Sequence, residues 1–319
     1  MDKNPFKPFL ERRGHAVLDG GLGTELESSG HDIGDALWSA RLLHSDPAVI
    51  RAVHRSYFAA GADCTIGATY QASLEGFARL GLDTQQSARL LRASVAIARQ
   101  ARDEVCAEVA FGPDRPGPLV AASIGPYGAF LADGSEYRGN YGASNEDLRA
   151  FHRERWEILA QSGADVLACE TLPCLQEAEV LLDLLAESPG TWAWFAFQCR
   201  DERHIADGTR LRDCIEVVAA HPSVAAVGVN CTGPRFIEPL LEEIRQCDAA
   251  VPVIVYPNSG ECYNADDKTW HGDLDAVEFS EQALRWHAAG ADIIGGCCRT
   301  GPAHTRAIRE ALDRAGGSG

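Results

Sequence analysis

Gly163-Ala-Asp-Val-Leu-Ala-Cys-Glu170 is the clearest of three similar joints in this chain. The tripeptide Gly-Ala-Asp occurs again at 61–63 and at 290–292, and each copy stands between a helix-like stretch and a short apolar run. Glycine suits the left-handed position that follows a helix. A continuous apolar run is typical of a strand that is buried on both faces. The repetition therefore predicts one helix–glycine–strand joint that is used three times.

Further apolar runs of the same kind, bounded by turn residues, begin near Ala16, Leu119, Trp192, Val224 and Pro252. Together with the three joints they predict eight strands. The segments between them carry helical patterns, such as the stripe formed by Leu91, Val95, Ala98, Ala101 and Val105. Strands that alternate with helices favour an α/β fold whose parallel sheet closes into a single-domain (β/α)8 TIM-type barrel.

The barrel is expected to occupy residues 15–315, after an N-terminal extension at 1–14 and before a flexible tail at 316–319. An open, doubly wound sheet is the alternative. It is disfavoured because no G-x-G-x-x-G motif follows the first predicted strand, where Gly20-Gly21-Leu22-Gly23 is the nearest approach.

Composition excludes several classes of function. The 319 residues include 29 Lys and Arg against 46 Asp and Glu, a net charge of −17. Such a chain lacks the basic surface of a nucleic-acid-binding protein and would be repelled by an anionic membrane. Its apolar runs are strand-sized, and its first residues do not resemble a secretory signal. We therefore expect a cytoplasmic protein with no nucleic-acid or membrane partner, whose 11 cysteines do not form a disulfide framework.

Two long connections follow predicted strands, at 126–145 and at 257–272. The carboxyl ends of barrel strands form the face on which active sites are built. Loops of this length in a compact domain are usually functional or disordered, and the aromatic content of these two favours function.

Polar residues at the predicted strand ends are the main candidates for chemistry. Asp19 ends the first strand, Glu170 the fourth, Asn230-Cys231 the sixth and Cys297-Cys298 the eighth. Such ends converge on one opening of a barrel, however far apart they are in the sequence.

Cys231, Cys297 and Cys298 suggest a Zn²⁺ site with one of its four positions open. Gly295-Gly296 would allow the bend that brings both adjacent thiols to one ion. Two alternatives remain at this point, namely that the three are ordinary buried thiols or that Cys297 and Cys298 form a redox disulfide.

The other cysteines are interpreted as thiols of the core, with Cys174 and Cys262 less certain because they lie near strand ends. Asp19 and Glu170 could act as general acid and base or bind an ammonium group. Alternatively they could form a salt bridge or cap a helix, although Glu170 would otherwise be buried without a partner. The tyrosines of the 126–145 loop could serve only to pack it.

Three motifs carry a resemblance to a known family. They are Leu18-Asp-Gly-Gly-Leu-Gly-Thr-Glu-Leu26, Gly228-Val-Asn-Cys-Thr232 and Gly295-Gly-Cys-Cys-Arg-Thr300. In this order they resemble the homocysteine S-methyltransferases over nearly the whole chain. The segments at 123–139, 255–261 and 268–270 look like the branch that uses S-methylmethionine as methyl donor, rather than the betaine-using branch.

The resemblance implies a (β/α)8 barrel in which Cys231, Cys297 and Cys298 hold a catalytic Zn²⁺. It also implies that Asp19 and Glu170 bind the amino group of L-homocysteine. The expected reaction transfers a methyl group from a sulfonium, S-methylmethionine or S-adenosylmethionine, to the zinc-bound thiolate of L-homocysteine and gives methionine. No other catalytic residue is expected.

Three further residues complete the expected substrate-binding set: Asn230, Tyr127 and Tyr137. The two tyrosine rings could stabilise the sulfonium through cation–π contacts.

Other functions remain open at this point. They are methyl transfer from betaine or another donor to a thiol or selenol, a structural or storage metal site, and a metal-free barrel lyase or hydrolase that uses Asp19 and Glu170.

Overall fold

The computed structural model describes residues 3–33, 38–109, 115–260, 262–264, 269–271 and 274–316. Its centre is a sheet of eight parallel strands in the order β1-β10-β7-β6-β5-β4-β3-β2. The strands are β1 (Ala16–Val17), β2 (Cys64–Ile66), β3 (Leu119–Ile124), β4 (Val166–Leu172), β5 (Ala193–Phe197), β6 (Val224–Asn230), β7 (Val253–Tyr256) and β10 (Ile293–Ile294). All eight predicted strands are present.

The sheet closes into a barrel between its first and second strands. Leu18 and Cys64 form a parallel bridge there, and Asp19 N donates to Cys64 O at 3.1 Å. On the other side of β1, Ala16 is in register with Ile293 of β10. The predicted (β/α)8 barrel is therefore confirmed, and the open-sheet alternative is wrong.

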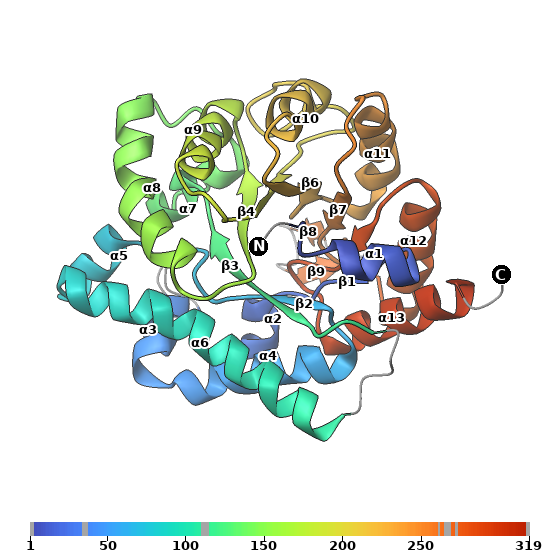
Figure 1. Ribbon diagram of the computed structural model, residues 1–319, viewed down its shortest axis with the longest axis horizontal. Helices are drawn as coiled ribbons and strands as arrows, with labels where there is room; N and C mark the ends of the chain where they lie inside the picture. Colours follow the sequence, from blue (N-terminus) through green and yellow to red (C-terminus); the bar gives the residue numbers. More distant parts are fainter. Residues whose placement is uncertain are drawn as a thin grey trace.

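Helices form a ring around the strands (Figure 1). The helices of the described residues, of which α1 lies inside this ring, are α1 (Lys7–Arg13), α2 (Leu22–Ser28), α3 (Trp38–Ser45), α4 (Pro47–Ala60), α5 (Leu74–Arg79), α6 (Thr84–Glu108), α7 (Tyr127–Leu131), α8 (Asn145–Ala160), α9 (Leu175–Ala186), α10 (Leu211–Ala219), α11 (Ile237–Arg245), α12 (Ala276–Ala288) and α13 (Pro302–Gly316). The stripe predicted on α6 is buried along its whole length. Two 3-10 turns, η1 (Ser135–Tyr137) and η2 (Pro234–Phe236), and an antiparallel pair, β8 (Cys262–Asn264) with β9 (Thr269–His271), lie in the connections.

The Gly-Ala-Asp joints are built as predicted. Gly61, Gly163 and Gly290 have φ values of 108°, 85° and 107°, in the left-handed region that glycine adopts most easily. The aspartates have a function that the sequence did not reveal. Each accepts a hydrogen bond from a backbone N–H near the start of a neighbouring strand: Asp63 from Val17 (2.9 Å), Asp165 from Val120 (2.8 Å) and Asp292 from Val253 (2.8 Å). Each joint therefore also fixes the register of an adjacent strand.

The N-terminal extension closes the amino-terminal end of the barrel. Phe6 and Phe9 are buried in the cluster of side chains inside the barrel, and the Phe6 ring lies 5.9 Å from that of Trp194. Asn4 Nδ2 donates to Ala225 O at 2.7 Å. In Figure 1 helix α1 crosses the strands within the ring of helices. The described residues thus fill this end of the barrel, and the opposite, carboxyl-terminal end is where a site is expected.

Of the predicted tail, Gly316 is the last residue of α13, and 317–319 lie outside the described residues. Within the described part of the chain, no helix combines the length and apolar character that crossing a bilayer requires.

Candidate active site

The structure brings the three predicted thiols together at the carboxyl-terminal end of the barrel. Cys231 follows β6, while Cys297 and Cys298 follow β10. Their Sγ atoms all lie within 4.8 Å of one another, and the Sγ atoms of Cys231 and Cys298 are 3.8 Å apart. All three thiols are free, so Cys297 and Cys298 form no disulfide here.

The chain leaves the eighth strand earlier than the sequence suggested. Cys297-Cys298 was expected to end this strand, but β10 ends at Ile294. A Cβ on Gly295 would lie 2.5 Å from Leu18 Cβ, and one on Gly296 would lie 2.2 Å from Thr300 Oγ1. The two glycines thus let the backbone bend inside tight packing, as expected, and both cysteines lie on the turn beyond the strand.

Backbone strain is concentrated at this opening. Five non-glycine residues in the described ranges have positive φ, and Thr171 (57°), Cys231 (48°) and Arg299 (65°) border one cavity. Strained conformations persist where the surrounding fold imposes them, and they cluster at functional sites. At Cys231 the left-handed turn comes directly after the strand that carries its thiol to the opening.

The thiols fit a metal ion. Two thiolates on one tetrahedral Zn²⁺, with Zn–S bonds of about 2.3 Å, are separated by about 3.8 Å. This matches the distance between Cys231 and Cys298, whereas a disulfide requires about 2.05 Å. Three thiolates also form a soft donor set of the kind that zinc prefers. The donor atoms and their spacing are therefore those of a metal centre with room for a further ligand.

Hydrogen bonding within the cluster favours negative charge at Cys298. Hydrogen bonds with Cys231 and Cys297 hold the pKa of the Cys298 thiol well below its usual value, and the Arg299 guanidinium lowers it further. Tyr137 Oη lies 3.6 Å from Cys231 Sγ and covers the cluster from the loop after β3.

A cavity of about 390 Å³ opens over the thiols. The charged residues that the structure places on its walls are Glu27, Glu136, Glu170 and Arg299. Arg299 Nη1 pairs with Glu27 Oε2 at 3.0 Å, so negative charge exceeds positive charge inside. The cavity therefore favours a ligand that carries positive charge.

Glu170 is the buried carboxylate of this cavity. It lies within β4, two residues before the end of the strand, rather than at the end as expected. Ser123 Oγ donates to Glu170 Oε1. Burial raises the pKa of Glu170 to about 7, although hydrogen bonds from Ser123 and Tyr256 lower it in part. Among the described residues no cation pairs with Glu170, so the structure offers no support for the salt-bridge interpretation.

Asp19 lies just beneath the cavity. Its neighbour Gly20 lines the wall, and its own Oδ2 accepts a hydrogen bond from the backbone N–H of Ile66 at 2.7 Å. Burial raises the pKa of Asp19, and the nearby charge of Glu170 adds to this. The two acidic residues therefore lie close together, with Glu170 on the cavity wall and Asp19 behind it.

Asn230 is buried, and both polar atoms of its amide form hydrogen bonds within the protein. Its Oδ1 accepts from the backbone N–H of Thr171 at 2.7 Å, and its Nδ2 donates to Thr171 Oγ1 at 2.8 Å. This double contact holds the strained end of β4 next to Glu170, where the register with β5 shifts. The structure thus favours a positioning role for Asn230 over direct contact with substrate.

The two tyrosines proposed from the sequence lie in different places. The Tyr127 ring packs within 6 Å of the rings of Phe130, Tyr141 and Phe151, with centroid distances of 5.8, 5.6 and 5.0 Å. It is not part of the cavity wall, so the structure favours the packing interpretation. Tyr137, in contrast, lines the cavity and is 46% exposed, so its ring is accessible to a ligand.

Sequence reasoning missed Ser123, Tyr256, Glu136 and Arg299 as residues of the site. Ser123 and Tyr256 gave the same signal as Glu170, since Ser123 lies inside an otherwise apolar strand and Tyr256 ends one. Glu136 and Arg299 stand within segments that carry the resemblance, but neither was singled out, because charged loop residues are common.

The remaining cysteines mostly behave as expected. Those at 64, 169, 174, 199, 214 and 247 are buried. The interpretation of Cys106 as a thiol of the core is wrong, because its side chain on α6 is exposed to solvent. The side chain of Cys262 lies outside the described residues.

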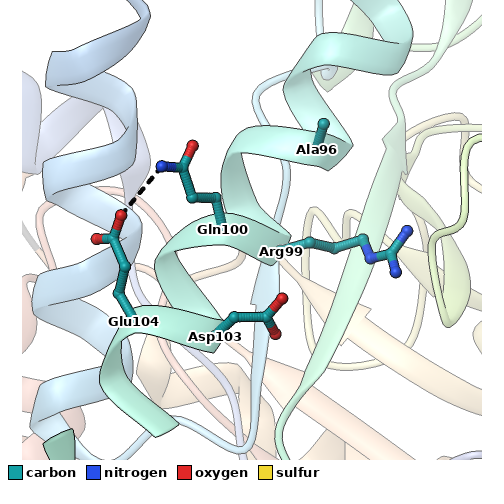
Figure 2. A pocket seen from close by; sticks show the side chains of 5 residues that line it. All are labelled: Ala96, Arg99, Gln100, Asp103 and Glu104. Carbon is teal, nitrogen blue, oxygen red and sulfur yellow. Dashed lines mark hydrogen bonds between the residues drawn. The ribbon is translucent and has the colours of Figure 1, made fainter. Parts of the chain in front are cut away.

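A second hollow, of about 560 Å³, lies on one face of α6 between Ala96 and Glu104 (Figure 2). Its five lining residues are side chains of one helix, and two of them pair with each other, Gln100 Nε2 with Glu104 Oε1 at 3.1 Å. It contains no thiol and shares no residue with the cavity over the cysteines. The thiol cluster therefore belongs to the cavity at the barrel opening and not to this hollow.

Fold and site together define a barrel enzyme with a thiol cluster suited to a metal ion. The chain belongs to the homocysteine S-methyltransferase family, whose profile matches residues 16–312. It is 49% identical to homocysteine S-methyltransferase YbgG of Bacillus subtilis over 305 residues, which cover 96% of both chains. It is also 45% identical to selenocysteine Se-methyltransferase of Brassica oleracea var. italica, over 95% of this chain and 90% of that protein.

Crystal structures of the homocysteine methyltransferase MmuM from Escherichia coli are similar throughout. The metallated form is 44% identical and superposes with a TM-score of 0.86, covering 98% of this chain and 100% of that one. The oxidised form gives a TM-score of 0.87 at the same identity, with 97% and 99% covered. This protein is accordingly an enzyme of the homocysteine-methylating family, and its cysteine cluster is suited to a metal ion.

Proposed function

We propose that the enzyme catalyses zinc-dependent methyl transfer from a sulfonium donor, S-methylmethionine or S-adenosylmethionine, to the sulfur of L-homocysteine, giving methionine. The observation that carries the proposal is the cluster of Cys231, Cys297 and Cys298 at the base of a cavity with excess negative charge. Thiols of this kind stay reduced in the cytoplasm, which is the compartment we expect.

The acceptor must lose its proton to become nucleophilic. A free thiol has a pKa near 8.5, so little thiolate is present at neutral pH. Zn²⁺ held by Cys231, Cys297 and Cys298 would supply a Lewis acid that promotes loss of this proton. Glu170 on the cavity wall, with Asp19 close behind it, holds the acceptor's ammonium group and thereby aims its sulfur at the donor. The protein then needs no separate general base at the sulfur.

The transfer step is a displacement at carbon. The homocysteine thiolate sulfur attacks the methyl carbon of the donor, and a new S–CH₃ bond forms as the bond to the sulfonium sulfur breaks. The electron pair of the broken bond remains on the donor sulfur, which becomes a neutral thioether. The barrel walls contribute by alignment of the two sulfurs and the methyl carbon, since proximity and orientation lower the barrier to such reactions.

Cavity charge supports a sulfonium donor over betaine. S-Methylmethionine and S-adenosylmethionine each carry a net positive charge in their sulfonium amino-acid part, whereas betaine is neutral overall. Glu136 and Glu170 on the wall favour the cation, and the exposed ring of Tyr137 offers it a cation–π contact.

Steady-state rates of methyl transfer to homocysteine from S-methylmethionine, S-adenosylmethionine and betaine, measured side by side, test the proposal. We expect kcat/KM for one of the sulfonium donors to exceed that for betaine by at least about a hundredfold, which corresponds to about 3 kcal/mol. Selenocysteine is included as a second acceptor because of the relative that carries this name. Turnover with betaine alone would contradict the proposed donor, and absence of turnover with every donor would contradict the proposed reaction.

A further inference from the structure

We propose that Glu136 binds the ammonium group of the methyl donor and so selects donors that are amino acids. This inference rests on the proposed function, because it assigns the donor side of the same cavity. It is carried by two observations, the rigid mounting of the segment that contains Glu136 and an acceptor oxygen of its carboxylate that no described residue satisfies.

The segment that contains Glu136, residues 127–141, is held at both ends by one buried carboxylate. Glu177 of α9 is fully buried. Its Oε1 accepts from the backbone N–H of Tyr127 at 2.6 Å, and its Oε2 accepts from Tyr141 Oη at 2.8 Å. These two contacts lie on either side of Glu136 in the chain. A single side chain therefore anchors the loop before and after the residue that enters the cavity.

Two buried side chains of α8, His152 and Arg155, hold Glu177 in place in turn. His152 Nε2 lies 2.7 Å from Glu177 Oε1, and Arg155 Nη2 lies 2.9 Å from His152 Nδ1. Arg155 Nη2 also donates to Gly125 O at 2.6 Å, directly before the segment. Inside the segment the packing is tight, since a Cβ on Gly128 would lie 2.5 Å from Glu136 N. Glu136 is thus presented by a preorganised backbone.

One oxygen of the Glu136 carboxylate has no protein partner among the described residues. Glu136 lines the cavity, and its Oε2 is shielded from solvent with no hydrogen bond from any described residue. The charge of Arg138 acts on Glu136, but Arg138 Nη2 donates to the backbone O of Asp133 at 3.1 Å. A buried acceptor without a partner is destabilising. A ligand that supplies an N–H donor would remove this cost.

The chemistry of the methyl donor identifies the group that the Glu136 carboxylate would bind. A sulfonium sulfur has no N–H, so it cannot satisfy a hydrogen-bond acceptor, but the ammonium group of S-methylmethionine can. The acceptor's ammonium is already assigned to Glu170 and Asp19, on β4 and after β1. Glu136 comes from the loop after β3, next to Tyr137, whose hydroxyl reaches the cysteine cluster. The two substrates are thereby bound by separate carboxylates.

A pair of donors tests the assignment. One is S-methylmethionine, and the other is 4-(dimethylsulfonio)butanoate, the same sulfonium without the amino group. A charge-assisted hydrogen bond of this kind corresponds to a factor of about 10–100 in affinity. We expect Glu136→Gln to raise KM for S-methylmethionine by about this factor and to leave KM for homocysteine within about twofold. The variant should also lose the preference that the wild type shows for S-methylmethionine over the amino-free donor.

The control is Glu146→Gln, an exposed residue in the first turn of α8. It should leave both KM values unchanged. Equal losses with both donors in Glu136→Gln, or a rise in KM for homocysteine instead, would overturn the assignment. If the wild type transferred no methyl group at all, the proposed function would fail separately. Calorimetric titration of S-methylmethionine into wild type and Glu136→Gln would then still test the role of Glu136 in donor binding. A weaker Kd in the variant would support this role, and equal Kd values would reject it.

Discussion

Cys231 and Cys298 are 67 positions apart in the chain, yet their Sγ atoms lie 3.8 Å apart. The strands before them, β6 and β10, are not direct neighbours, since both pair with β7. The thiol cluster therefore forms only when β6 and β10 are both paired with β7. A metal ion on these thiols would link the segments after these two strands and so stabilise this part of the sheet.

Metal content gives the first prediction. We expect about one Zn²⁺ per chain in protein purified under reducing conditions, and loss of this ion in Cys231→Ser and Cys298→Ser. Cys106→Ser is the matched control, because Cys106 is exposed on α6 outside the cluster. Elemental analysis of the four proteins checks this. Zinc retained by Cys298→Ser at the wild-type level would show that the ligands lie elsewhere.

Glu170→Gln should affect binding of homocysteine rather than turnover. The carboxylate is proposed to hold an ammonium that is present in both ground and transition states. We therefore expect kcat/KM for homocysteine to fall by about one to two decades, mainly through KM. Steady-state kinetics with homocysteine and with 4-mercaptobutanoate, its analogue without the amino group, measures this. A fall in kcat at unchanged KM would instead support a general-base role for Glu170.

Asp63 and Asp292, which belong to two of the three repeated joints, should contribute differently to the free energy of unfolding. Asp63 is fully buried and pairs with Arg309, besides accepting from Val17 N. Its replacement by Ala removes the buried carboxylate that faces both Arg309 and Arg115, and we expect a cost of about 3–5 kcal/mol. Asp292→Ala removes mainly one backbone hydrogen bond and should cost about 1–2 kcal/mol. Guanidinium unfolding midpoints compare the two, and equal losses would contradict this ranking.

Stability should fall in acid in a way that depends on His54. This residue is fully buried and its two ring nitrogens have no partner among the described residues. Burial lowers the pKa of His54 to about 4. Below about pH 6.5 the unfolded chain binds a proton at this histidine that the folded chain does not bind until about pH 4. Stability is therefore lost as the pH falls through this range.

The expected loss attributable to His54 is about 2 kcal/mol between pH 7 and pH 5. His54→Leu removes this contribution, so its free energy of unfolding should decline less over the same interval. Other titrating groups, His15 included, are present in both proteins and cancel in the comparison. Unfolding of wild type and variant at the two pH values provides the measurement. Parallel declines would contradict a neutral, buried His54.

Local patterns predicted most of the fold. The eight strands and the Gly61, Gly163 and Gly290 joints depend on burial periodicity and on left-handed backbone, which leave marks within a few residues. The early end of β10 was not predictable in this way. It is imposed by Thr300 and Leu18, which pack against Gly296 and Gly295, and such contacts are not visible in the local sequence.

The site was predictable to a smaller extent. Cys231, Cys297 and Cys298 stand near strand ends, and barrel geometry brings such ends together. Asn230 stands at a strand end too, but its amide is used by Thr171, a contact across the sheet that the sequence does not specify. Glu136 was missed because its importance lies in an oxygen without a partner, which is a property of the packed structure.

The most direct test of the whole account is the rate of methionine formation from homocysteine and S-methylmethionine before and after removal of metal. Protein stripped with a chelator under reducing conditions should retain less than about one hundredth of the rate, a loss of about 3 kcal/mol in transition-state stabilisation. One equivalent of Zn²⁺ should restore the activity. An unchanged rate in the stripped protein would contradict a metal centre at Cys231, Cys297 and Cys298, and would favour metal-free chemistry by Asp19 and Glu170.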